Sequence, residues 1–113
     1  MDAYTIGGVT ALPGSTASGT LAVTGNAGDA TTIPFTIIHG IAAGPVLLLV
    51  AGTHGSEYVP IIALQRLRVS IDPATICGTI LMVHVANMPS FLKRTVYYSP
   101  GDGQNLNRVF PGR

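Results

Sequence analysis

An unbroken apolar run, Val46 to Ala51, is the feature that most constrains how this chain can fold. Apolar residues without polar alternation are typical of a strand covered on both faces, as in the middle of a parallel or mixed sheet. A glycine-bounded turn follows directly. It carries His54 and, three residues later, Glu57, which is the only glutamate of the chain. The run therefore predicts a buried strand that ends in two polar side chains.

The segment after this turn predicts a helix from Glu57 to about Arg68. Its apolar residues recur at helical spacing, so we expect them to form the buried face: Val59, Ile62, Ala63 and Leu67. Ser56 is a suitable N-cap, and Pro60 is tolerated because it lies in the first turn. A further apolar strand is expected from Gly78 to Val85. The order strand, helix, strand is typical of an α/β sheet.

The residues before the apolar run predict short antiparallel strands. Glycine-containing turns and loops separate three β-prone segments, which are residues 4–10, 16–24 and 31–39. Gly25 to Asp29 is expected to be a loop, and Pro34, which has no amide hydrogen, is expected at a sheet edge or at a strand's beginning. The expected fold is α/β, with a mixed sheet containing one strand–helix–strand unit. We expect one domain of 113 residues, with a β-rich lead-in at 1–40 and an α/β portion carrying the His54 turn at 41–113.

The last part of the chain, Asn87 to Arg113, is expected to be mostly loop, with a turn of helix around Ser90 to Lys93. It is dense in polar side chains that can act on a ligand: Arg94, Asp102, Asn105, Asn107 and Arg108. In open α/β sheets, ligands bind outside the carboxyl ends of the strands. The His54 turn follows one such end and this loop follows the next, so both are expected to face one crevice.

His54 and Glu57 are candidate ligands of one zinc ion. Zinc takes imidazole nitrogen and carboxylate oxygen, and a catalytic site commonly has three protein ligands plus water. A second interpretation stays open, in which His54 bonds to nearby backbone and the helix dipole favours Glu57. The other two histidines, His39 and His84, lie in strands and are expected to be structural.

Arginine and asparagine side chains form a second candidate constellation. Asn107 and Arg108 together suit recognition of a substrate carboxylate, because the guanidinium is a planar fork and the amide adds a directional donor. Arg94 could stabilise the oxyanion that develops when water attacks a carbonyl. The alternative for Arg94 is a solvated loop residue beside Lys93.

Composition limits the partners and the location. The formal net charge is +1, which does not favour nucleic acid or an anionic membrane as a partner. Charged residues are 10% of the chain, against about 25% in typical soluble domains. We therefore expect an apolar surface that a second copy or further polypeptide covers.

Cys77 is the single cysteine and is expected to be buried; a chain without disulfides suits the cytoplasm. Neither a signal peptide nor a membrane span is expected, since prolines and glycines interrupt the long uncharged segment 33–51.

Three motifs together resemble the succinylglutamate desuccinylase/aspartoacylase family, a branch of the zinc carboxypeptidase superfamily. His54-Gly55-Ser56-Glu57 resembles its H-G-x-E metal motif. The segment 87–91 resembles its N-P-x-A-F segment, and 102–112 resembles its D-G-x-(D/N)-L-N-R-x-F-P-G segment. The resemblance implies part of a carboxypeptidase-like fold and a zinc-dependent hydrolase that cleaves an amide or ester bond in a small carboxylate-bearing acyl substrate.

By the matching positions, the resemblance implies that His54 and Glu57 bind zinc and that Arg94 polarises the scissile carbonyl. It also implies that Asn107 and Arg108 hold a substrate carboxylate. Asn105 stands where the aspartoacylase branch has an aspartate that supports a ligand histidine; an amide can fill that role without the charge.

The family also has a third zinc ligand and a general-base glutamate, and neither matches a residue of this sequence. The chain is thus expected to be the N-terminal part of such an enzyme, with little or no activity by itself. Two alternatives stay open: a carboxypeptidase that acts on peptide C-termini, and a non-catalytic domain that binds a partner through its apolar face.

Overall fold

A computed structural model describes residues 1–24 and 30–112. The loop expected at Gly25 to Asp29 lies outside the described residues. The regular elements are β1 (Tyr4–Ile6), β2 (Val9–Ala11), β3 (Ser15–Thr24), β4 (Ala30–His39), β5 (Ala42–Val50), α1 (Tyr58–Ser70), β6 (Cys77–Val83) and α2 (Met88–Lys93), with short 3-10 turns η1 (Pro73–Thr75) and η2 (Leu106–Arg108).

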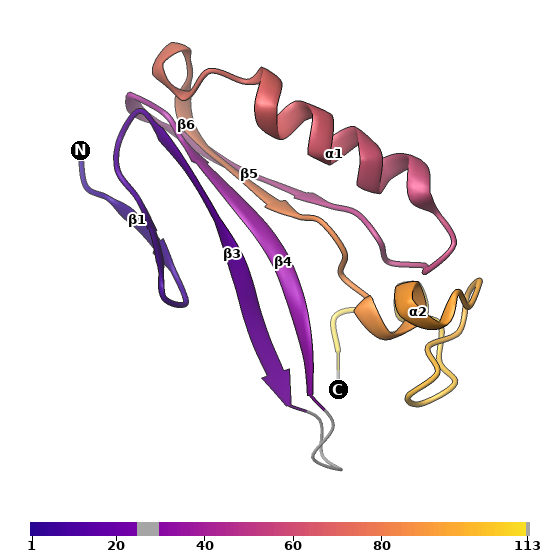
Figure 1. The fold of residues 1–113 in the computed structure, drawn as a ribbon. Helices are drawn as coiled ribbons and strands as arrows, with labels where there is room; N and C mark the ends of the chain where they lie inside the picture. The colour runs from indigo at the N-terminus through magenta and orange to yellow at the C-terminus, as the bar shows by residue number, and fades with distance from the viewer. Residues whose placement is uncertain (25–29, 113) are drawn as a thin grey trace.

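The elements form three layers around a mixed sheet (Figure 1). The sheet has four strands in the order β3-β4-β6-β5, in which β3, β4 and β6 pair antiparallel and β5 pairs parallel with β6. The crossover from β5 to β6 contains α1, which lies over one face of the sheet. Residues 4–10, expected as one β-prone segment, form the two strands of the β1–β2 hairpin, which turns at Gly7-Gly8 and packs against the other face. The predicted α/β class and its strand–helix–strand unit are confirmed.

The core has two parts because successive side chains of a strand point to opposite faces. On the α1 side, Ile38 and Met82 of the sheet are fully buried and pack with Ile61 and Leu64 of the helix. On the hairpin side, neighbouring β4 residues such as Ile37 pack with Ala11. The central strands β4 and β6 thus contribute side chains to both layers.

The apolar run was expected to be buried, and this expectation is wrong. It forms β5, which has β6 as its one sheet neighbour within the described ranges. Val46, Leu47 and Leu48 are 54%, 53% and 57% exposed. The physical reason is the strand order: after the crossover, β6 inserts between β4 and β5 and leaves β5 outermost. Cys77, at the start of β6, is also exposed rather than buried.

Pro34 does not lie at a sheet edge, because its strand β4 is interior, nor does β4 begin there. Its carbonyl accepts a hydrogen bond from His84, which lies just beyond the end of β6. The nitrogen and carbonyl of one strand residue point to the same side, so Pro34 lies opposite His84 and its missing amide hydrogen falls at the end of the β4–β6 ladder.

The helix also differs from its sequence prediction. Glu57, not Ser56, holds the N-cap position of α1, and no side chain caps it. The buried residues are Ile61 and Leu64, whereas Val59 is 79% exposed. Apolar residues occur all around this helix, so spacing alone could not choose the face that meets the sheet. The predicted helical turn near Ser90 is confirmed as α2.

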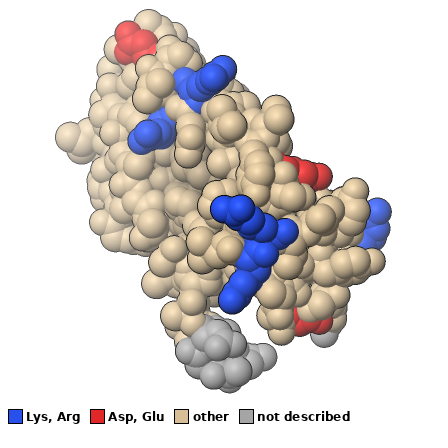
Figure 2. Space-filling model, turned by 45° about the vertical axis from the view of Figure 1, so that its right-hand side comes forward, with Lys and Arg blue, Asp and Glu red and all other residues tan. Residues whose placement is uncertain are grey.

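Charged side chains are few and scattered on the face that Figure 2 shows. Within 1–24 and 30–112, none of the helices has the length and apolar character needed to cross a membrane.

Replacing Ile38 by Ala should lower the free energy of unfolding by about 2–5 kcal/mol, because the side chain is fully buried between α1 and the sheet. Val59→Ala removes an exposed apolar side chain and should change it by about 0.5 kcal/mol or less. Urea denaturation of both variants measures the difference. Equal losses in the two would contradict the assignment of the core.

Candidate metal site at the carboxyl end of the sheet

The turn between β5 and α1 is fixed by its contact with the chain that leaves β6. Asn87 donates to the carbonyl of Gly52 at 2.9 Å, and its side chain donates to the carbonyl of Thr53 at 3.3 Å. Gly52 has a φ of +73°, which glycine adopts readily. A Cβ on Gly55 would collide with the carbonyl oxygen of Ser90 in α2. Glycine at these two positions therefore lets the turn dock closely on α2.

His54 and Glu57 meet at this turn. The Nδ1 atom of His54 lies 3.0 Å from Oε1 of Glu57. The two side chains are 13% and 50% exposed, so the imidazole is largely covered while the carboxylate reaches solvent. The turn carries His54 and Glu57 holds the N-cap position of α1, and this spacing places both groups on one side.

Asn105 holds the other ring nitrogen of His54. Its Oδ1 atom lies 2.8 Å from Nε2 of His54 and 3.0 Å from the backbone nitrogen of Asn107. The atom that faces a backbone N–H must be the amide oxygen, which only accepts. Nε2 of His54 therefore carries the proton and donates it to Asn105. In the neutral imidazole, the lone pair then lies on Nδ1, which faces Glu57.

Two lone-pair donors at hydrogen-bond distance need a positive charge between them. The Nδ1 lone pair and the Glu57 carboxylate can share either a proton or a metal ion. The pair is thus a candidate for two ligands of one cation, and an amide from the loop orients its histidine.

Tyr97 is a neighbour of His54 that the sequence did not reveal. Its ring makes an edge contact with the imidazole, with ring centroids 5.2 Å apart and planes at 87°. The residue is 53% exposed and lies in a loop without a periodic pattern. A tyrosine in such a loop carries no local signal, so only the fold could have identified it.

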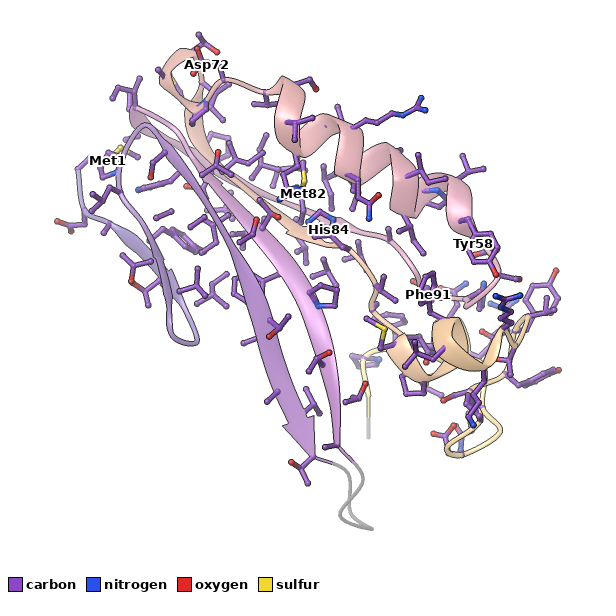
Figure 3. The ribbon with its side chains drawn as sticks, in the orientation of Figure 1. Met1, Tyr58, Asp72, Met82, His84 and Phe91 are labelled. Atoms are coloured by element: carbon purple, nitrogen blue, oxygen red, sulfur yellow. The ribbon has the colours of Figure 1, made fainter. Side chains whose placement is uncertain are left out.

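The arginines and Asn107 are placed differently from one another. Arg94 ends α2 in a left-handed conformation. It lines a hollow of about 550 Å³ together with Tyr58 and Phe91. The rings of Tyr58 and Phe91 are in edge contact (Figure 3). Asn107 and Arg108 lie exposed in η2, directly after Asn105. Among the described residues, neither a hydrogen bond nor an ion pair joins Arg94, Asn107 or Arg108 to the His54–Glu57 pair by its side chain. The fold therefore brings His54, Glu57 and Asn105 into contact and leaves the side chains of Arg94, Asn107 and Arg108 outside this hydrogen-bonded group.

His39 and His84 have structural contacts. His39 is buried, with Nδ1 2.8 Å from the Thr79 hydroxyl and Nε2 2.7 Å from the carbonyl oxygen of Asp2. His84 points to the α1 side of the sheet, as Met82 does (Figure 3), and its Nε2 lies 2.7 Å from the Thr36 hydroxyl. Burial, and then the nearby charge of Arg68, lowers the pKa of His84 below its ordinary value of 6.5. Within the described parts of the chain, no group of three His, Cys, Asp or Glu side chains could hold a metal.

His84 should make stability depend on pH. Because its pKa is lowered on folding, the unfolded chain binds the proton more readily. The stabilising contribution is therefore present above pH 6.5 and is lost as the pH falls below that value. We expect wild type to lose more stability than His84→Gln between about pH 8 and about pH 5.5, as measured by urea denaturation. Parallel curves for the two proteins would contradict this.

Polar side chains at the carboxyl end of a parallel strand are typical of the ligand-binding crevice of an open α/β sheet. A family model described as "Succinylglutamate desuccinylase/Aspartoacylase catalytic domain" matches residues 43–113. The chain belongs to this family. The expected fold class is confirmed, because the chain matches part of the fold of aspartoacylase-family structures.

Similar proteins of known sequence and structure support the same family. The chain is 40% identical over 89 residues to N-alpha-acetyl-L-2,4-diaminobutyric acid deacetylase from Halomonas elongata, covering 77% of this chain and 25% of that protein. The crystal structure of an aspartoacylase family protein from Mesorhizobium loti matches with a TM-score of 0.78 and 37% identity, over 90% of this chain and 32% of that one. The product-bound ectoine utilization protein EutE (DoeB) from Ruegeria pomeroyi matches with a TM-score of 0.70 and 33% identity, over 88% and 30%. The chain thus spans about a quarter to a third of the length of these relatives.

Proposed function

We propose that this chain carries part of the active site of a zinc-dependent deacylase, which hydrolyses an amide or ester bond in a small carboxylate-bearing N-acyl substrate. Membership of the desuccinylase/aspartoacylase family supports the reaction class. The name of the Halomonas relative, a deacetylase of an N-acetylated amino acid, supports the substrate class.

The observation that carries the proposal is the facing pair of His54 Nδ1 and Glu57 Oε1, 3.0 Å apart. Two ligand atoms of a tetrahedral zinc ion, each at about 2.0–2.2 Å, lie about 3.3–3.6 Å from each other. The observed 3.0 Å is a hydrogen-bond distance, so the two atoms would move apart by about 0.3–0.6 Å to hold one ion. The donor types also fit, since zinc binds imidazole and carboxylate. When bound, zinc would act as a Lewis acid toward the substrate carbonyl and make water more acidic.

The remaining residues would orient and bind. Asn105 keeps the Nε2 proton of His54 in place, so that Nδ1 stays available as a ligand. Arg94 would donate to the scissile carbonyl oxygen and stabilise its developing charge. Asn107 and Arg108 are exposed beside Asn105, where their donors could bind a substrate carboxylate.

Zinc binding to the chain tests the donor pair. His54→Ala and Glu57→Gln should each abolish measurable zinc binding in titration calorimetry, because each removes one of two ligands. Asp2→Asn, a carboxylate-to-amide change at the exposed N-terminus, should leave binding unchanged. Zinc binding that survives both ligand variants would refute the site.

Asn105 offers a graded version of this test. Asn105→Ala should weaken zinc binding by about 10–100-fold, since partners that orient a ligand histidine have effects of that size. Asn105→Asp should strengthen it, because a carboxylate accepts the Nε2 proton more strongly than an amide. An equal loss in the two variants would show that His54 does not depend on this acceptor.

The reaction also needs a general base, and Glu57 cannot be both ligand and base. Because Glu57 is the only glutamate in the 113 residues, we expect the chain by itself to show little or no turnover of N-acyl amino acids. A release assay for the free amine, run with and without a chelator, measures this. Chelator-sensitive turnover at a rate typical of enzymes would contradict the assignment of Glu57 as a ligand.

A further inference from the structure

His54 is held from two sides by one segment of the loop. Asn105 bonds its Nε2 atom, and Tyr97 makes the edge contact with its ring. The centroid separation of 5.2 Å lies inside the range of about 4.5–7 Å in which aromatic pairs attract. The two contacts come from residues that are near each other only because the loop folds back on itself.

Backbone hydrogen bonds make that fold-back a small hairpin, residues 98–105. Tyr98 and Asn105 form an antiparallel bridge. Ser99 donates to Gln104 and accepts from Gly103, both at 2.8 Å. The start of the loop is tied to α2, because Thr95 donates to the carbonyl of Ser90 at 3.0 Å. The hairpin therefore presents Tyr97 and Asn105 together.

The two contacts restrict different motions of the imidazole. A single hydrogen bond at Nε2 fixes where the tip of the ring lies but lets the ring plane turn. The direction of the Nδ1 lone pair lies in that plane, so the plane decides whether the lone pair faces Glu57. Glu57 is half exposed and can follow the ring rather than hold it. A neighbouring ring at 87° resists rotation of the plane.

We propose that Tyr97 is a positioning residue for His54: it sets the plane of the imidazole and so aims Nδ1 at the cation shared with Glu57. This inference rests on the proposed function, because it assigns to His54 the role of a metal ligand. The phenol ring acts by contact, and its hydroxyl is not needed for the effect.

Tyr97→Leu tests the proposal in the 113-residue chain. Two signals are measured: the ring-proton and ring-nitrogen NMR shifts of His54 without metal, and the zinc affinity. We expect loss of the ring-current shift, a change in the ring nitrogens, and zinc affinity weakened by about 2- to 12-fold, which corresponds to the usual strength of an aromatic pair. Tyr97→Phe keeps the ring and should restore both signals.

Tyr98→Leu is the matched control, since Tyr98 is the next residue, is 61% exposed and enters the hairpin through its backbone. It should leave His54 unchanged. His54 signals and zinc affinity that are unaffected by Tyr97→Leu would overturn the proposal. So would equal effects of Tyr97→Leu and Tyr98→Leu, which would indicate general loosening of the hairpin, or a failure of Tyr97→Phe to restore the signals.

The two proposals fail in different ways. If the unaltered chain binds no zinc, the proposed function fails, and the NMR comparison still decides whether Tyr97 orients the ring. If the chain binds zinc through His54 and Glu57 but Tyr97→Leu changes neither signal, only the positioning role fails.

Discussion

The parallel pairing of β5 with β6 continues beyond the ends of both strands, and the candidate site depends on this continuation. Ala51 donates to Val83, Ala86 donates to Ala51 and Asn87 donates to Gly52, each at 2.9 Å. These bonds bring the His54 turn beside the start of α2 (Figure 1). The pairing register thus determines which residues of the turn meet the loop. Gly52 and Gly55 have no side chain, and this lets the turn approach the backbone at Val85 and Ser90 closely.

A second consequence is that the chemistry of His54 is decided by a distant part of the chain. Asn105 lies 51 residues away, yet its amide oxygen determines which ring nitrogen keeps the proton. That oxygen is itself oriented by the backbone of Asn107, in the short turn η2. The asparagine therefore links the motif around Asn107 and Arg108 to the His54–Glu57 pair.

Local patterns predicted most of the elements and the principal pair. The strand–helix–strand order and the helical turn near Ser90 follow from turn residues and apolar spacing, which act over a few positions. The same patterns misplaced β5, Pro34 and the buried face of α1. Each of these depends on which strand lies beside which, and a strand's neighbours are set by contacts far apart in the sequence. For the site, local patterns could not place Arg94, which lines a hollow together with residues of α1 and α2.

The sequence by itself predicted that His54 and Glu57 lie in one turn between a strand and a helix, because the apolar run, the two glycines and the helical spacing mark such a turn locally. It also determined the family, through three motifs whose spacing is fixed by the chain. Only the tertiary structure decided that β5 is outermost, that Nδ1 is the nitrogen facing Glu57, and that Tyr97 lies against the ring. These features depend on β6 inserting between β4 and β5 and on a loop folding back, and both join residues that no local interaction brings together.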